Sequence, residues 1–325
     1  MTSGTIRKGL ILAACMLASG TGLANAETVL RLAENQPETN PVTVAMHRFA
    51  ELVGEYTDGE VKVDVYSGAQ LGQEVESIEQ VQAGIIDLAR VNTVPLANVT
   101  PAVGVFTLPY IFSGSEHKYK VLDGEIGQKV RADMAEAGLV GFDFMEAGSR
   151  SFYTREGLPI SELADLSGLK IRVQNSPISI LMVELLGGVP TPMNYGEVFS
   201  ALQTGVIDGA ENDFVSFHTS GHYEVAPNYV IDGHLSPPAI VIMNKARFDS
   251  LPEDQQQAIS KAAKEAAIYE RELMFAANDK ARTTVEEAGV SVVEIDNGPF
   301  QAAILPIYEE FPHLGDLIEQ IRAVD

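Results

Sequence analysis

Short β-rich runs alternate with amphipathic helical stretches along most of the chain, from residue 29 to residue 244. This alternation predicts α/β lobes with largely parallel sheets, because a parallel strand is normally reached through a helical crossover. The first elements that the pattern predicts are strands at Val29–Ala33, Val61–Val65 and Ile85–Ala89, and helices at Pro41–Tyr56 and Glu74–Ala83.

A weak internal repeat sharpens this prediction. The segment Gln82-Ala83-Gly84-Ile85-Ile86-Asp87 recurs 121 residues later as Gln203-Thr204-Gly205-Val206-Ile207-Asp208. Each copy ends a predicted helix with glycine and opens a strand that leads into polar residues. Joints of this kind are common, so a chance match is the alternative. Taken as a repeat, the two copies predict two similar lobes with polar groups at the carboxyl ends of their strands, where open α/β sheets bind ligands.

The last third of the chain predicts one long helix. Ser250-Leu251-Pro252-Glu253 has the pattern of a capping box with proline near the helix start. Helix-forming residues then dominate to Glu287, and the next glycine is Gly289. A helix of about 36 residues is about 54 Å long, which exceeds one lobe and allows it to lie across both.

The first 26 residues have the pattern of a secretory signal. Arg7 and Lys8 precede an apolar run, and Ala24-Asn25-Ala26 supplies a cleavage pattern. The run is shorter than the ~20 residues that span a bilayer. A lipoprotein box at Leu12-Ala13-Ala14-Cys15 is the alternative, with only a short hydrophobic stretch before it. We expect cleavage after Ala26, loss of the only cysteine, and a mature protein in the periplasm.

The charge of the chain narrows the class of ligand. The sequence has 45 acidic and 22 basic residues, a formal net charge of −23. Nucleic-acid binding needs a basic surface, so we expect no such partner. A strongly acidic protein can still bind an anion where a few arginines are concentrated inside a cleft.

The usual enzyme signatures are absent from the sequence, including the nucleophile elbow, the phosphate-binding loops and the H-E-x-x-H zinc motif. His218 and His222 have metal-ligand spacing, but Gly221 lies between them, and we expect packing roles and no metal or cofactor. Glu211 and Asp213 could act as base in a secreted sugar-acid enzyme. Without a nucleophile or metal beside them, we expect no enzyme.

One strand carries an arginine of particular interest. In the segment 169–174 the apolar residues alternate with Lys170, Arg172 and Gln174. An arginine at the end of a mostly buried strand is costly unless its guanidinium meets an anion. Its planar fork matches a carboxylate. The residues alone leave open whether Arg172 binds a ligand, lies on an exposed face or pairs with an internal acid.

The chain as a whole resembles the solute-binding subunits of TRAP (tripartite ATP-independent periplasmic) transporters. The matching segments stand in order along the sequence: Gln70–Gly72, Gly84–Asp87, Phe106–Phe112, Gly148–Phe152, Leu169–Val173 and Ala201–Gly209. The resemblance implies an α/β, two-lobed periplasmic binding protein fold with a long helix spanning both lobes. It also implies a ligand cleft between the lobes and a membrane permease as partner. We expect lobe I at 27–148 and 236–277, lobe II at 149–235 and 278–325, and a monomer.

The resemblance also implies which residues contact the ligand. Arg172 matches the arginine that clamps the ligand carboxylate, and Arg150 matches a second arginine, with a structural salt bridge as its alternative. The remaining candidates are Asn212, Arg90, Glu74, Asn35, Tyr195 and Asp213. The run from Ala89 to Leu96 resembles members that bind sugar acids, so we expect a hexuronate such as glucuronate or galacturonate. A keto-sugar acid, an aldonate and a C4-dicarboxylate remain alternatives, because Phe214-Val215-Ser216-Phe217 departs from the expected pattern and Arg90 could meet a second acid group.

Overall fold

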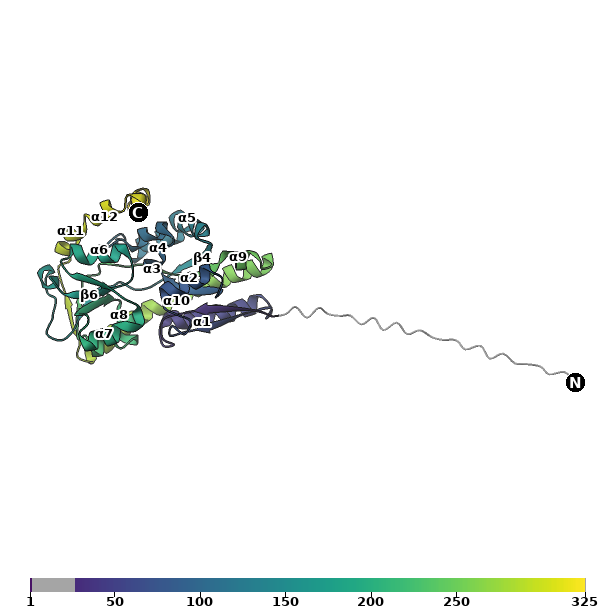
Figure 1. The fold of residues 1–325 in the computed structure, drawn as a ribbon, viewed down its shortest axis with the longest axis horizontal. Coiled ribbons are helices and arrows are strands. Elements are labelled where there is room, and N and C mark those ends of the chain that lie inside the picture. The colour runs from purple at the N-terminus through teal and green to yellow at the C-terminus, as the bar shows by residue number, and fades with distance from the viewer. Residues whose placement is uncertain (2–26, 325) are drawn as a thin grey trace.

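The computed structural model describes Met1 and residues 27–324. The predicted signal segment and Cys15 lie outside the described residues. Two sheets, each with helices against it, form the molecule, and Figure 1 shows α1 at one end and α7 and α8 at the other. The predicted α/β architecture is confirmed.

The first sheet has five strands in the order β2-β1-β3-β10-β4. Their bounds are β1 Thr28–Ala33, β2 Val61–Tyr66, β3 Leu88–Asn92, β4 Leu139–Met145 and β10 Ala239–Asn244. The helices that follow these strands are α1 Pro41–Tyr56, α2 Glu74–Gln82, α3 Thr93–Leu96, α4 Ser115–Asp123, α5 Glu125–Asp133 and α9 Lys245–Asp249. The side chain of Asn40 caps α1 by accepting from the Val42 amide, and Pro41 occupies the first turn, so this helix begins where the sequence predicts.

The second sheet has six strands in the order β11-β9-β5-β8-β6-β7. Their bounds are β5 Ser151–Thr154, β6 Lys170–Val173, β7 Val189–Pro192, β8 Gly209–Asn212, β9 Asn228–Ile231 and β11 Ser291–Glu294. The accompanying helices are α6 Pro177–Leu185, α7 Val198–Thr204, α8 Phe214–Thr219, α11 Gly298–Ile304, α12 Ile307–Glu310 and α13 Gly315–Arg322.

The prediction of largely parallel sheets is confirmed, with one strand in each sheet that runs against the others. In the first sheet β10 runs antiparallel to β3 and β4, and in the second β5 runs antiparallel to β8 and β9. The chain enters β5 directly from β4, and β10 directly from β9, each time passing from one sheet to the other. A strand reached in this way needs no helical return, so it is free to run against its neighbours.

These two crossings lie side by side. The backbone amide of Arg150 in the first crossing donates to the carbonyl of Leu235 in the second at 2.7 Å. A third connection is α10 (Glu253–Glu287, 35 residues), which packs on α1 and β4 of the first sheet and on α8 of the second. Figure 1 shows this helix between the two ends of the molecule, as predicted.

The predicted capping box at the start of α10 was wrong. The helix begins at Glu253 with Pro252 at its N-cap, and no side chain caps it. Ser250 instead ends α9, and its hydroxyl donates to the Arg247 carbonyl at 2.6 Å. The segment 250–253 therefore contains the end of α9 and the start of α10, and not a single capping box.

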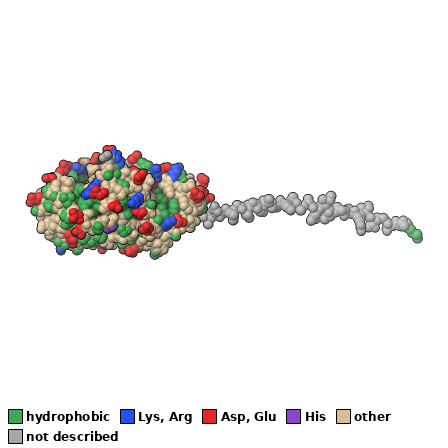
Figure 2. Space-filling view, turned by 90° about the horizontal axis from the view of Figure 1, so that it is seen from above, with side chains coloured by type: hydrophobic (Ala, Val, Ile, Leu, Met, Phe, Trp, Pro, Cys, Tyr) green, Lys and Arg blue, Asp and Glu red, His purple; other side chains and the backbone are tan. Residues whose placement is uncertain are grey.

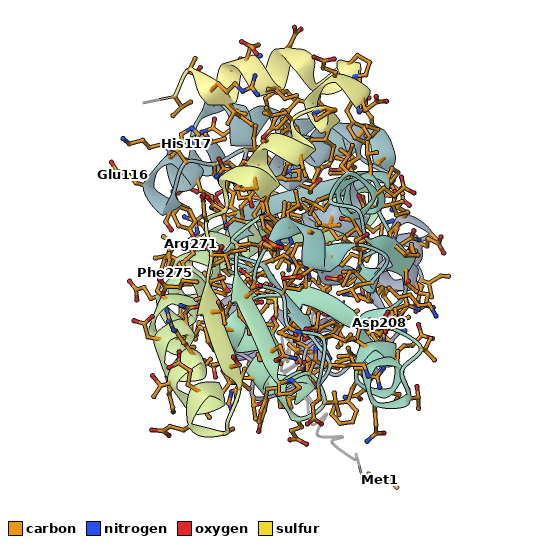
Figure 3. The ribbon with its side chains drawn as sticks, turned by 90° about the vertical axis from the view of Figure 1, so that its left-hand side faces the viewer. Met1, Glu116, His117, Asp208, Arg271 and Phe275 are labelled. Carbon is orange, nitrogen blue, oxygen red and sulfur yellow. The ribbon has the colours of Figure 1, made fainter. Side chains whose placement is uncertain are left out.

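Side-chain contacts fix the middle of α10 against α4. Arg271 forms a two-bond ion pair with Asp123 at 2.7 Å for each bond, and its guanidinium lies 4.2 Å from the centre of the Tyr119 ring. Phe275, one turn later, meets the same ring edge-on. Figure 3 shows Arg271 and Phe275 on the side of the molecule that carries Glu116 and His117 of α4.

The internal repeat is confirmed by matching local structure. α2 and α7 each end before a glycine with positive φ, Gly84 at 68° and Gly205 at 76°. Asp87 and Asp208 then accept backbone hydrogen bonds from neighbouring strands, at 2.8 and 2.9 Å. The amides of Ile85 and Ile86 bond back to Gln80, which moves the start of β3 three residues beyond its predicted place.

The C-terminal segment contacts elements of both sheets. α11 and α12 lie against α6, whereas α13 lies against α5. The exact division of the chain into two lobes therefore remains a prediction. Acidic side chains are spread over the face shown in Figure 2. Within the described part of the chain, no helix combines the length and hydrophobicity needed to cross a membrane.

Candidate ligand-binding site

A cavity lies between the two sheets, with about 380 Å³ of atom-free space that includes its opening to solvent. Its walls come from the carboxyl ends of β1, β3, β6 and β8, from the first crossing, and from α2, α8 and α10. The lining residues are Asn35, Gln36, Val42, Glu74, Arg90, Asn92, Ala147, Arg150, Arg172, Gln174, Tyr195, Asn212, Ser216 and Met274. The fold therefore brings together all the predicted site residues except Asp213.

Arg172 is a buried cation without an acidic partner. Its side chain is 3% exposed, and its Nε and Nη2 donate to the carbonyl of Met193 at 3.1 and 2.8 Å. Among the described residues, no carboxylate lies within ion-pair distance of it. Burial lowers the pKa of Arg172; the charge of Glu211 opposes this effect, and the nearby Arg150 adds to it. The arrangement favours an anion at the unused edge of the guanidinium.

Arg150 lines the same cavity, but its charge is already balanced. It pairs through Nε and Nη2 with the carboxylate of Glu211, and Nη1 donates to the Asn212 amide oxygen at 2.6 Å. Burial alone would raise the pKa of Glu211, but Arg150 and His234 hold it down to about 2. A carboxylate with so low a pKa is a poor general base, which argues against Glu211 as the base of the alternative enzyme.

Arg90 is also paired within the protein. Its Nε donates to Glu34 at 2.7 Å, Nη2 contacts both Glu34 and Asn35, and Nη1 lies 3.6 Å from Glu74. Glu34 is 1% exposed, so the pair is enclosed. Of the three guanidiniums on the cavity, Arg90 and Arg150 thus have carboxylate partners.

The uncharged candidates lie where their amides and ring can reach the cavity. The Asn212 oxygen is held by Arg150 and by the amide of Asp213, so its nitrogen can donate elsewhere. The Tyr195 hydroxyl lies 2.6 Å from that of Ser220, while its ring lies 5.8 Å from the Arg172 guanidinium. Asn35 accepts from Arg90 at 2.9 Å.

Asp213 is the candidate that the structure places elsewhere. Its side chain caps α8 by accepting from the Ser216 amide at 2.9 Å, and it does not line the cavity. The repeat explains this position, because Asp213 corresponds to Asn92, the N-cap residue of α3. We therefore leave Asp213 out of the proposed site.

Comparison with known proteins gives the family of the chain. The family model of bacterial extracellular solute-binding proteins, family 7 (DctP), matches residues 32–313. The chain belongs to the DctP family. A solute-binding protein of Chromohalobacter salexigens is 38% identical over 291 residues, which are 88% of this chain and 86% of that protein. The predicted resemblance to TRAP solute-binding subunits is confirmed.

Two solved DctP-family structures are especially similar. A TRAP solute-binding protein of Xanthobacter autotrophicus with bound β-D-galacturonate is 42% identical, with a TM-score of 0.89. One from Roseobacter denitrificans with bound β-D-glucuronate is 41% identical, also with a TM-score of 0.89. Each comparison covers 91% of this chain and 100% of the other.

Sequence reasoning missed several residues that line the cavity of this DctP protein. Gln174 lies two positions after Arg172, and Asn92 two positions after Arg90, so strand alternation could have identified both. Met274 approaches from α10, and no local pattern marks it. His222, a weak metal candidate, is instead buried and bonded to the Tyr153 hydroxyl at 2.8 Å. In the described residues no cluster of three or more metal-ligating side chains occurs.

A buried charge network behind Arg150 makes the stability of the protein sensitive to pH. His234 donates to Asp232 at 2.7 Å, and its other nitrogen lies 3.7 Å from Glu211. Burial opposes charge on His234, but Asp232 and Glu211 raise its pKa from 6.5 to about 9. Because the pKa of His234 is higher in the folded than in the unfolded protein, protonated His234 stabilises the fold. This contribution is fully present below pH 6.5 and is lost as pH rises through about 9.

We expect His234→Gln to remove this dependence. Between pH 6 and pH 10 the free energy of unfolding of the wild type should fall by about 3 kcal/mol more than that of the variant. Chemical unfolding at several pH values measures the difference. Equal slopes for the two proteins would show that the pKa of His234 does not change on folding.

Proposed function

We propose that this DctP protein is exported to the periplasm after cleavage behind Ala26, binds one hexuronate as a monomer, and delivers it to a TRAP membrane permease without chemical change. The similar proteins with bound galacturonate and glucuronate support the class of ligand. The family supports the transport role, because its members are extracellular solute-binding proteins.

The observation that carries the proposal is the charge balance of the cavity. Arg172 is its one guanidinium without a carboxylate partner in the described part of the chain, whereas Arg90 and Arg150 are paired with Glu34 and Glu211. One unpaired cation suits a ligand with one carboxylate. A dicarboxylate would bring a second negative charge towards Glu74 with no free cation to meet it.

Groups from both sheets surround the cavity, which supports binding by closure of the lobes. Arg90 and Glu74 belong with the first sheet, and Arg172 and Asn212 with the second. Direct bonds also join the two sides, including Asn98 to the Asn175 carbonyl at 2.8 Å. A ligand that contacts both sides stabilises the closed form, since those contacts exist only there.

A thermal-shift screen tests the proposal. Hexuronates, aldonates, keto-sugar acids and C4-dicarboxylates are compared, with neutral glucose as the control. We expect galacturonate or glucuronate to raise Tm, since a ligand at 100 times its Kd stabilises the native state by about 2.7 kcal/mol. Stabilisation by C4-dicarboxylates with no response to any sugar acid would refute the ligand class and leave the transport role standing.

A further inference from the structure

Two amide side chains, one from each sheet, converge on Glu74 at the cavity wall. Asn92, at the end of β3, donates to Glu74 Oε1 through its backbone amide at 2.8 Å and through its Nδ2 at 2.9 Å. Gln174, just beyond β6, donates its Nε2 to Glu74 Oε2 at 3.1 Å. All three residues are buried and line the cavity.

The contact with Glu74 fixes which way both amides face. A carboxylate only accepts hydrogen bonds, so each amide must turn its NH2 group towards Glu74 and its carbonyl oxygen away. Arg90 Nη1 lies 3.6 Å from Glu74 Oε1 on the same side of the cavity. The amide orientations therefore follow from chemistry as well as from fit to the network.

The two amide oxygens are left without donors. Asn92 Oδ1 and Gln174 Oε1 are both buried, and neither has a hydrogen-bond partner among the described residues. Buried polar atoms without partners are rare in native proteins and call for an explanation at each site. Here two such oxygens occur in one cavity wall, each turned from the same carboxylate.

We propose that Asn92 and Gln174 are a pair of hydroxyl acceptors that make the site selective for ligands donating two hydroxyl hydrogens, and that Glu74 is the positioning residue that fixes their polarity. This inference rests on the proposed function and deepens it. A sugar acid supplies such donors, whereas an ionised second carboxylate supplies none. Glu74, predicted from the sequence to contact the ligand, then acts through the two amides.

Titration calorimetry on the full mature protein tests the pair. The ligands are galacturonate, glucuronate and their monodeoxy and monofluoro analogues, in which fluorine cannot donate. We expect Gln174→Met and Asn92→Leu each to weaken hexuronate binding by about tenfold, because each removes one acceptor. Each variant should bind one particular deoxy analogue as well as the wild type does, since that ligand lacks the lost hydrogen bond. Gln257→Met, on the exposed face of α10, is the matched control and should change nothing.

Glu74→Gln provides a readout that a purely structural role would not change. A glutamine can donate, so either amide can turn over, and the preference for the hydroxylated ligand over its deoxy analogue should fall by about tenfold. Full affinity and unchanged preference in all three variants would overturn the inference while hexuronate binding by the wild type still stood. If the variants do not fold, calorimetry of the wild type with the parent sugar acid and its analogues is sufficient. Equal affinity for the parent and every analogue would overturn the inference. Failure of the wild type to bind any sugar acid would instead refute the proposed function itself.

Discussion

Arg172→Met should abolish most of the ligand affinity while leaving the ligand-free protein at least as stable as the wild type. Truncating one partner of a buried, hydrogen-bonded charge pair costs about 2–5 kcal/mol, or roughly 30-fold to several thousand-fold in Kd. Without ligand the guanidinium is buried and has no acidic partner within the described residues. Removing an uncompensated buried charge relieves its desolvation cost, so stability should not fall.

Calorimetry and thermal unfolding of the same preparations measure the two halves of this prediction. Arg172→Lys should also bind weakly, because a point ammonium cannot reproduce the fork that meets two carboxylate oxygens. Arg48→Met is the control, since Arg48 lies on α1 in exposed pairs with Glu51 and Glu55. Near-normal affinity in Arg172→Met would remove this residue from the site.

Arg150→Met should have the opposite profile, with a large loss of stability. The change leaves Glu211 buried at 2% exposure without its paired guanidinium, with only His234 at 3.7 Å as a nearby cation. Breaking a buried ion pair by removing one partner costs about 3–5 kcal/mol. Chemical unfolding of the ligand-free protein measures the loss. The double variant Arg150→Met/Glu211→Leu should recover part of the lost stability, because it also removes the unpaired carboxylate. An equally unstable double variant would show that the loss does not come from the broken Arg150–Glu211 ion pair.

These contrasting profiles separate two arginines that the sequence presented as similar. Arg172 lies in β6, Arg150 directly precedes β5, and both line the cavity. The sequence could not show that Glu211 faces Arg150, because that contact depends on β8 pairing with β5 in one register. Nor could it show that the Arg172 guanidinium donates to the Met193 carbonyl, which lies just beyond the end of β7.

Much of the fold followed from local patterns. α1 has its predicted bounds because Asn40 and Pro41 mark its start. The repeat predicted the helix-glycine joints before β3 and β8, because a glycine with positive φ follows each helix, but β3 begins three residues later than predicted. The reversed direction of β5 and β10 was not predictable, since it depends on how the chain crosses between sheets. The acceptor pair at Asn92 and Gln174 was missed because Glu74 orients both amides. Glu74 is 18 residues from Asn92 and 100 residues from Gln174 in sequence, so no local pattern links them.

The central claim is that one ligand carboxylate binds Arg172 inside the cavity between the sheets. A crystal structure of the protein with galacturonate tests this most directly. We predict carboxylate oxygens about 2.7–2.9 Å from the Arg172 guanidinium, with Arg90 and Arg150 still paired to Glu34 and Glu211. A carboxylate bound to Arg90 or Arg150 instead, with Arg172 still contacting only Met193, would contradict the account.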